Sequence, residues 1–169
     1  MISSFPARLA YGMISLSIFF KVQQETGSIA AAGLATGING VAGATTAGLR
    51  GSLIDKYGMK IPLRFFAPTY ALLILLFSSG TSKTQLIVFA GILGLSAPPI
   101  NLSIRPLWKV TVTREQIRTA YAIDTAVMNS VGVFGPLLAT TLSLSKTPEL
   151  ALQICSGLIC IRSEERRVG

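Results

Sequence analysis

Four long stretches of the chain contain no charged residue, and charged residues cluster between them. The stretches cover residues 26–49, 65–82, 84–104 and 125–145, so each is 18 to 24 residues long. A helix that crosses the hydrocarbon core of a bilayer, about 30 Å thick, needs about 20 mostly apolar residues. A soluble protein of this length has no interior large enough for four such helices. The pattern therefore predicts membrane-spanning helices in all four stretches.

Two further apolar segments are weaker. Residues 9–20 lie between Arg8 and Lys21, so a full span here needs one or both cations to reach the membrane surface. A signal peptide is the alternative, although the residues after Lys21 form a poor cleavage site. Residues 150–161 are too short to span.

We predict helices at 5–22, 28–50, 63–80, 84–106, 117–143 and from 149 onward. The predicted fold class is therefore an all-α, polytopic transmembrane bundle with five complete spans and a partial sixth.

Composition agrees with a membrane protein, and the charges add an orientation. Half of the residues are hydrophobic, 13% are charged and the mean hydropathy is +0.60. If the connections alternate sides, nine cations fall on one side and three on the other. The first side carries Arg8, Arg50, Lys56, Lys60, Arg64, Arg105, Lys109, Arg114 and Arg118, and the second carries Lys21, Lys83 and Lys146. This excess predicts a multi-pass protein of the cell (plasma or inner) membrane with a cytoplasmic N-terminus, and Trp108 as an interfacial anchor. The net charge of +8 then follows from topology, so no nucleic-acid partner is expected.

The connection between the second and third predicted helices has a specific pattern. Residues 51–60 read Gly-Ser-Leu-Ile-Asp-Lys-Tyr-Gly-Met-Lys. Gly51 allows the helix end to pack closely against a neighbour, and Gly58 permits a positive φ in a tight turn. Asp55 is an acid among bases, which can accept charge-assisted hydrogen bonds or face a helix N-terminus. A solvated basic turn is the simpler alternative.

This segment resembles the signature loop of the major facilitator superfamily, G-x-L-a-D-[RK]-x-G-[RK]-[RK]. The matching residues are Gly51, Leu53, Asp55, Lys56, Gly58 and Lys60. The resemblance covers about residues 5–161 and implies the N-terminal six-helix half of a twelve-helix transporter. Each half of such a transporter contains two inverted three-helix repeats, with substrate near the membrane midplane. The resemblance also implies that this loop gates the cytoplasmic face, and Met59 removes one base from that charge network.

Two charged residues and a proline motif lie in the fourth and fifth predicted helices. An ionisable group at membrane depth normally has a partner, so Arg105 and Asp124 are expected to pair. The resemblance implies that Arg105 belongs to the gating network. Asp124 is a candidate proton-binding acid, with a structural salt bridge or an interfacial position as the alternative. Gly132, Gly135 and Pro136 resemble a Gly-Pro motif of family exporters, and a proline kink explains them equally well.

Small and polar residues within the spans give further expectations. The second predicted helix carries small-residue seams suited to tight helix packing, one from Gly33 to Gly37 and one from Gly40 to Gly48. The resemblance implies that the first, second, fourth and fifth helices line the transport path. The candidates for substrate contact are Tyr11, Asn39, Asn101 and Asn129. For the asparagines, an interhelical hydrogen bond is the alternative.

Missing residue types and the end of the chain narrow the function. The sequence contains no His, and Cys155 and Cys160 have apolar neighbours, so no cofactor, metal site or catalytic dyad is expected.

Residues 162–169 resemble the translation of a DNA-sequencing adapter, with a native basic tail as the alternative. We expect residues 1–161 to be a fragment that ends within its sixth helix. The predicted function is alternating-access transport of a small molecule, and an enzyme is not expected. The predicted partners are the bilayer, the missing C-terminal half, an unknown substrate and protons; a membrane scaffold without transport activity is the alternative.

Overall fold

The computed structural model describes residues 5–58, 60–98, 116–145 and 148–165, and these residues form helices without any strand. The helices are α1 (Phe5–Thr26), α2 (Ile29–Tyr57), α3 (Lys60–Ser78), α4 (Lys83–Ser96), α6 (Ile117–Ser145) and α7 (Pro148–Glu165). The predicted all-α fold class is confirmed, and each helix begins within three residues of its predicted start. The ends agree less well. The largest difference at a described turn is that α2 continues through Tyr57 instead of ending at Arg50.

Local chemistry explains several of these helix ends. Gly27 takes a φ of 64° between α1 and α2, which glycine adopts without steric cost. Ser28 is the N-cap of α2, and its side chain accepts a hydrogen bond from the Ala31 N–H at 3.2 Å. Gly58 ends α2 with a φ of 72°. Pro148 begins α7, where its missing N–H leaves no intrahelical bond unmade.

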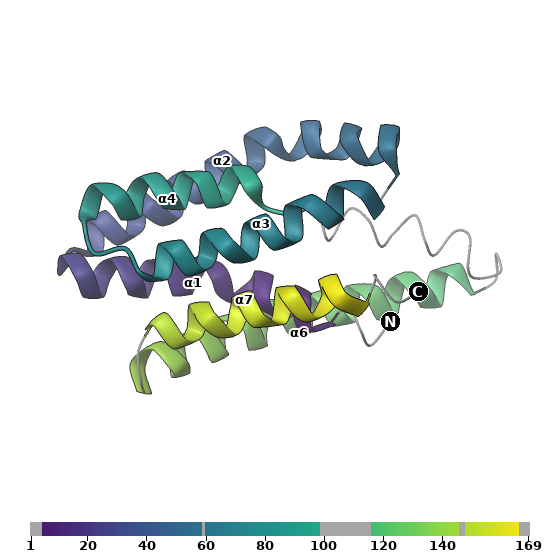
Figure 1. The fold of residues 1–169 in the computed structure, drawn as a ribbon. Coiled ribbons are helices and arrows are strands. Elements are labelled where there is room, and N and C mark those ends of the chain that lie inside the picture. Colours follow the sequence, from purple (N-terminus) through teal and green to yellow (C-terminus); the bar gives the residue numbers. More distant parts are fainter. Residues whose placement is uncertain (1–4, 59, 99–115, 146–147, 166–169) are drawn as a thin grey trace.

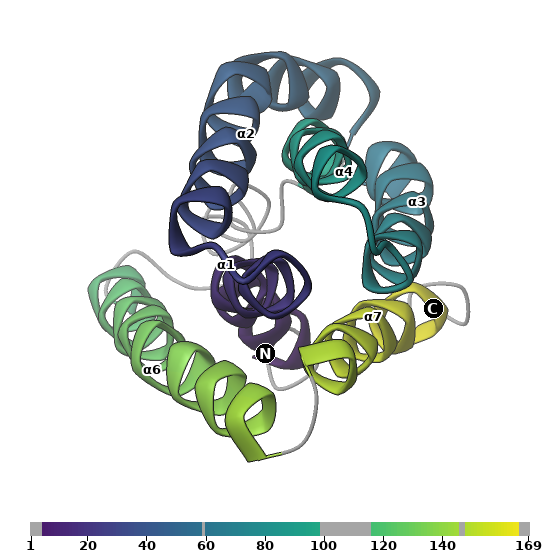
Figure 2. The same ribbon diagram turned by 90° about the vertical axis from the view of Figure 1, so that its left-hand side faces the viewer.

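The helices lie side by side along a common direction (Figure 1). The turns after α1 and α3 and the end of α6 lie at one end of the bundle. The start of α1, the turn between α2 and α3, the start of α6 and the end of α7 lie toward the other end. Viewed along the bundle, α1 lies between α2, α6 and α7, whereas α3 lies between α4 and α7 (Figure 2).

Several of the helix contacts follow an internal symmetry, with the α1–α2 contact as the exception. Suppose that α1 is exchanged with α4, α2 with α6 and α3 with α7. The α1–α6 contact then corresponds to the α2–α4 contact. The same exchange carries α1–α7 onto α3–α4 and leaves α3–α7 in place. Two three-helix repeats related by a pseudo-two-fold axis produce this arrangement. It agrees with the repeat structure that the resemblance implies.

Apolar side chains occupy both the interior and the outer surface. The interior contains large buried residues of α1, α3, α4 and α7, including Met13, Ile74, Phe77, Leu93 and Leu152. Many large apolar residues are nevertheless exposed on the outer faces of α2, α3 and α6. By length and composition, α6 is the described helix that can cross a membrane unaided. Shorter apolar helices occupy Arg64–Ser78, Lys83–Ser96 and Pro148–Ile159. Outer faces of this kind match a lipid environment, since soluble proteins rarely expose such large apolar areas.

Two close helix crossings depend on glycine. A Cβ atom added to Gly135 of α6 would lie 2.8 Å from the carbonyl carbon of Gly12 in α1. A Cβ atom added to Gly94 of α4 would lie 2.3 Å from the Asn39 carbonyl oxygen of α2. Both crossings therefore bring backbone against backbone, as small residues permit in membrane helices.

The small-residue seams expected on α2 do not form such a contact with the described helices. Gly33, Gly37, Gly40 and Gly48 have no atom within 4 Å of an added Cβ. In this helix Gly43 is the glycine that faces α4, with the Gly94 carbonyl oxygen 3.6 Å from its added Cβ. Within the described bundle most of these glycines face outward, so packing of the two seams against another helix stays a prediction.

Candidate functional site

The segment that matches the signature pattern is a helix end followed by a tight turn. Residues 51–57 are the last two turns of α2 and residues 60–62 the start of α3, so the predicted loop at 51–62 was wrong in both of these parts. Gly51 has open space around it and packs against no neighbour, contrary to the expectation. Gly58 has the positive φ that was expected. No proline or other strong helix breaker precedes Gly58 in this segment, which explains why the helix continues to it.

The side chains of this segment point to solvent or lipid within the described bundle. Leu53, Asp55 and Lys56 are exposed. The Lys56 Nζ lies 5.4 Å from the centroid of the Tyr57 ring, a cation–π distance. Lys60 begins α3, and Met59 lies outside the described residues. The exposed acid and base are therefore available to another surface. Their part in a gating network stays a prediction.

Arg50, directly before this segment, is a residue that sequence reasoning assigned to the membrane surface. Its side chain is buried, with a residue exposure of 6%. Its guanidinium donates hydrogen bonds to the backbone carbonyls of Gly43, Thr46 and Ala97. The Ala97 carbonyl follows the end of α4, so Arg50 joins α2 to α4.

Asp124 has an ionic partner on another helix. The Arg8 Nη2 lies 2.7 Å from the Asp124 Oδ1, and the two side chains are 4% and 6% exposed. The pair joins the first part of α1 to the first part of α6. The Arg8 Nε is buried and has no hydrogen-bond partner within the described part of the chain. Arg105 lies outside the described residues, so its expected pairing with Asp124 stays a prediction.

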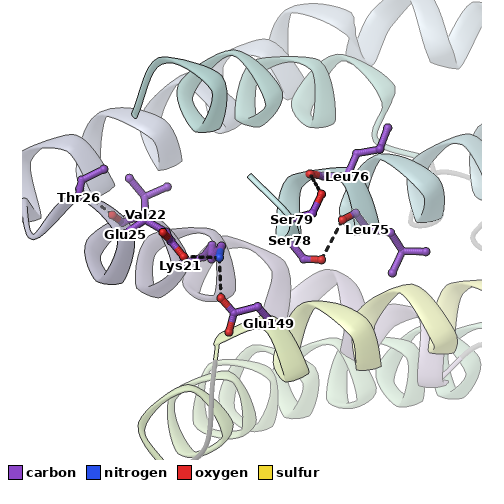
Figure 3. Close-up of polar contacts among 9 residues, drawn as sticks. All are labelled: Lys21, Val22, Glu25, Thr26, Leu75, Leu76, Ser78, Ser79 and Glu149. Carbon is purple, nitrogen blue, oxygen red and sulfur yellow. Dashed lines mark hydrogen bonds and ion pairs between the residues drawn. The ribbon is translucent and has the colours of Figure 1, made fainter. Parts of the chain in front are cut away.

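A second buried cation lies near the opposite end of α1. The Lys21 Nζ is 2.6 Å from Glu25 Oε1 and 2.5 Å from Glu149 Oε1. Figure 3 shows Lys21 and Glu149 pointing toward each other, from α1 and from the start of α7. The Lys21 side chain is 3% exposed, while the two carboxylates are about one quarter exposed. Arg8 and Lys21, which were expected to extend to the membrane surface, are instead both ion-paired inside the bundle.

The candidates for substrate contact have different surroundings. Tyr11 is half-buried and stacks on Tyr70 of α3 with ring centroids 6.4 Å apart. Asn39 is buried and donates a hydrogen bond to the Ala90 carbonyl of α4 at 2.9 Å, which is the interhelical alternative. Asn129 is exposed on α6. Asn101 lies outside the described residues. Tyr11 is therefore the described candidate with a side chain that is both partly accessible and held in place.

The Gly-Pro motif divides into two roles. Gly135 forms the close crossing with Gly12, whereas Gly132 is exposed and has no atom within 4 Å of an added Cβ. Pro136 lies inside α6, which continues past it to Ser145. The motif thus supplies one packing contact and one proline within a continuous helix. Among the described residues, no group of three or more His, Cys, Asp or Glu side chains is placed to hold a metal ion.

Taken together, a helical bundle with lipid-matched outer faces and buried ion pairs between helices is typical of a polytopic membrane transporter. The family model of the Major Facilitator Superfamily matches residues 1–161. No curated protein and no solved structure is significantly similar to the chain. The chain belongs to the Major Facilitator Superfamily, and it is therefore a membrane protein of a transporter family.

Proposed function

We propose that the chain forms the N-terminal bundle of an alternating-access secondary transporter for a small molecule. The observation that carries this proposal is the family match along residues 1–161, over a bundle whose helix contacts follow two three-helix repeats. Transport by such a fold requires a second bundle, because the substrate lies between two bundles that rock about it. Residues 1–161 alone are therefore expected to fold without transporting.

Reconstitution in proteoliposomes tests this proposal. The full-length protein is screened with radiolabelled sugars, organic acids, amino acids and lipophilic cations under an imposed pH gradient. Uptake or efflux of one class by the full-length protein, and of none by residues 1–161, is the expected result. Transport by residues 1–161 alone contradicts the two-bundle requirement. A full-length protein that moves no class supports the scaffold alternative instead.

The proposal includes an orientation with the N-terminus in the cytoplasm. It is supported by the exposed cations Lys56, Arg64 and Arg118, which lie on helix ends at the same end of the bundle as the start of α1. A membrane-impermeant maleimide tests it in intact cells. A Ser82→Cys variant is expected to react, and a Ser52→Cys variant only after permeabilisation. The reverse pattern contradicts the orientation.

The proposal also assigns proton coupling to Asp124. Asp124 is a buried carboxylate between two helices, and neutralising it would remove the charge that holds Arg8. The test is Asp124→Asn in the full-length protein, with proton movement followed by pyranine inside the vesicles. Loss of substrate-induced proton movement is expected. Thr125→Ala, an exposed neighbour on α6, serves as the control, and unchanged proton movement in Asp124→Asn contradicts the assignment.

A further inference from the structure

Arg50 lies where the signature segment and α4 meet. It directly precedes residues 51–58, and its guanidinium reaches the carbonyl of Ala97 beyond the end of α4. One side chain therefore joins α2 to α4.

The surroundings of Arg50 show what compensates its charge. No ion pair joins Arg50 to a carboxylate among the described residues, unlike the buried cations Arg8 and Lys21. Backbone carbonyls take that place, and one of them belongs to the end of α4. The carbonyl end of a helix carries partial negative charge and attracts cations. Separation of α2 from α4 would remove the Ala97 acceptor and leave this cation with only two carbonyls of its own helix, and such a loss is costly in a membrane.

The geometry of the contact requires arginine specifically. Nε, Nη1 and Nη2 each donate to a different carbonyl, of Thr46, Ala97 and Gly43 respectively. A guanidinium presents its donors in a fixed planar fork, whereas a lysine ammonium is a compact point charge on a flexible stem. Lysine at this position retains the charge but cannot reach the three acceptors at once.

We propose that Arg50 is a positioning residue that fixes the end of α4 to α2, so that residues 51–58 and α4 move as one body during transport. The inference rests on the proposed transport function, because a body that moves as a unit has this role only in a protein that alternates between states. Pro98 follows the contact and cannot continue the hydrogen bonding of α4. The Arg50 contact thus adds a bond from α2 to a helix end whose own backbone provides the Ala97 N–H bond to the Gly94 carbonyl.

Distances between spin labels test the inference independently of the substrate. Labels are attached to Ser52→Cys on α2 and Leu95→Cys on α4, both exposed positions, in a cysteine-free version of the full-length protein in nanodiscs. The parent protein is expected to give one narrow distance distribution. In Arg50→Gln and in Arg50→Lys the distribution is expected to widen about twofold, because helices released from a contact slide by about 1–2 Å or by a full turn. Arg64→Gln, an exposed arginine of α3, is the matched control and leaves the distribution narrow.

A transport measurement on the same variants separates positioning from general stability. With the substrate identified by the proteoliposome screen, Arg50→Lys is expected to lower the maximal rate about tenfold with KM nearly unchanged. A narrow distribution in Arg50→Gln overturns the inference. An Arg50→Lys protein with the parent's narrow distance distribution and the parent's maximal transport rate also overturns the inference, because a positive charge at this position is then sufficient. If Arg50→Gln does not fold, the distance distribution and the transport rate of Arg50→Lys test the inference instead. A widened distribution in a protein that transports nothing sustains the α2–α4 contact and instead contradicts the proposed function.

Discussion

Replacement of Gly135 by alanine adds a methyl group to the closest helix crossing of α1 with α6. The new Cβ would lie 2.8, 3.0 and 3.1 Å from the carbonyl carbon, Cα and oxygen of Gly12. Ordinary contacts of a Cβ begin at 3.4 Å, so the nearest of these is short by more than half an ångström. The contacted atoms belong to the backbone and cannot rotate away. The two helices must therefore separate, and overpacking of this kind costs about 1–3 kcal/mol.

The same helix provides a matched control. Gly132 lies about one turn before Gly135, is exposed, and has no atom within 4 Å of an added Cβ. Gly132→Ala therefore introduces no overlap. It removes backbone freedom from the unfolded chain and raises helix stability by up to about 1 kcal/mol. The two substitutions are chemically identical, so the difference between them reports the crossing itself.

Thermal unfolding of the full-length protein in detergent, followed by fluorescence-detected size exclusion, measures both variants. A change of 1 kcal/mol shifts the midpoint by about 2–4 °C in a protein of about 150–250 residues and by less in a longer one, so Gly135→Ala should lower it by a few degrees. Gly132→Ala should leave the midpoint unchanged or raise it slightly. Equal decreases in both variants, or a Gly135→Ala protein as stable as the parent, would refute the assigned crossing.

Three further variants test other contacts by the same unfolding assay. Asn39→Ala removes the buried hydrogen bond to the Ala90 carbonyl and should cost about 1–3 kcal/mol, whereas a change below measurement error contradicts a structural role for the amide. Lys21→Gln leaves two carboxylates facing each other and should cost about 3–5 kcal/mol. A second change, Glu149→Gln, should recover part of that loss, and failure to recover any of it contradicts the ion pair. Gly58→Ala forces a side chain into a positive φ and should cost about 1 kcal/mol, and an unchanged midpoint contradicts that backbone geometry.

The placement of the helices in the described part of the chain was predictable because it depends on local information. Uncharged stretches of sufficient length and the charges between them were enough to place each helix start. The end of α2 was not predictable in this way, because Arg50 read as a surface charge that closes a span. One of its three carbonyl acceptors, that of Ala97, lies beyond the end of α4, and that contact is not visible in local sequence. A helix can therefore extend past a charged residue when a neighbouring helix provides its acceptors.

The ionic partners show the same limit more clearly. Arg8 and Lys21 border a short apolar segment, and local reasoning placed both at the membrane surface. The structure pairs Arg8 with Asp124, and it pairs Lys21 with a glutamate that lies 128 residues away. A chain with only seven acidic residues offers few partners for its cations. That scarcity was the available signal, but it did not say which acid meets which base.

Several polar contacts in the described bundle join a helix of one three-helix repeat to a helix of the other. Arg8–Asp124 joins α1 to α6, Lys21–Glu149 joins α1 to α7, and Asn39 and Arg50 both join α2 to α4. Ser156 of α7 donates to a carbonyl of α3 at 3.1 Å, and Cys155 of α7 contacts a carbonyl of α1 at 3.6 Å. Each of these contacts connects one three-helix repeat to the other, and so do both glycine crossings.

This distribution has a mechanical consequence. In lipid, the free energy of an apolar side chain differs little between a lipid tail and an apolar residue of another helix. Hydrogen bonds, ion pairs and close backbone contacts therefore determine the register between helices. Contacts of that kind placed between the repeats resist sliding of one repeat against the other. Rocking of a whole bundle about a substrate requires that the bundle itself does not shear. The buried charges of this chain therefore have a structural explanation in the rigidity of the bundle, and loss of charge in either the Arg8–Asp124 or the Lys21–Glu149 pair would release a contact between repeats.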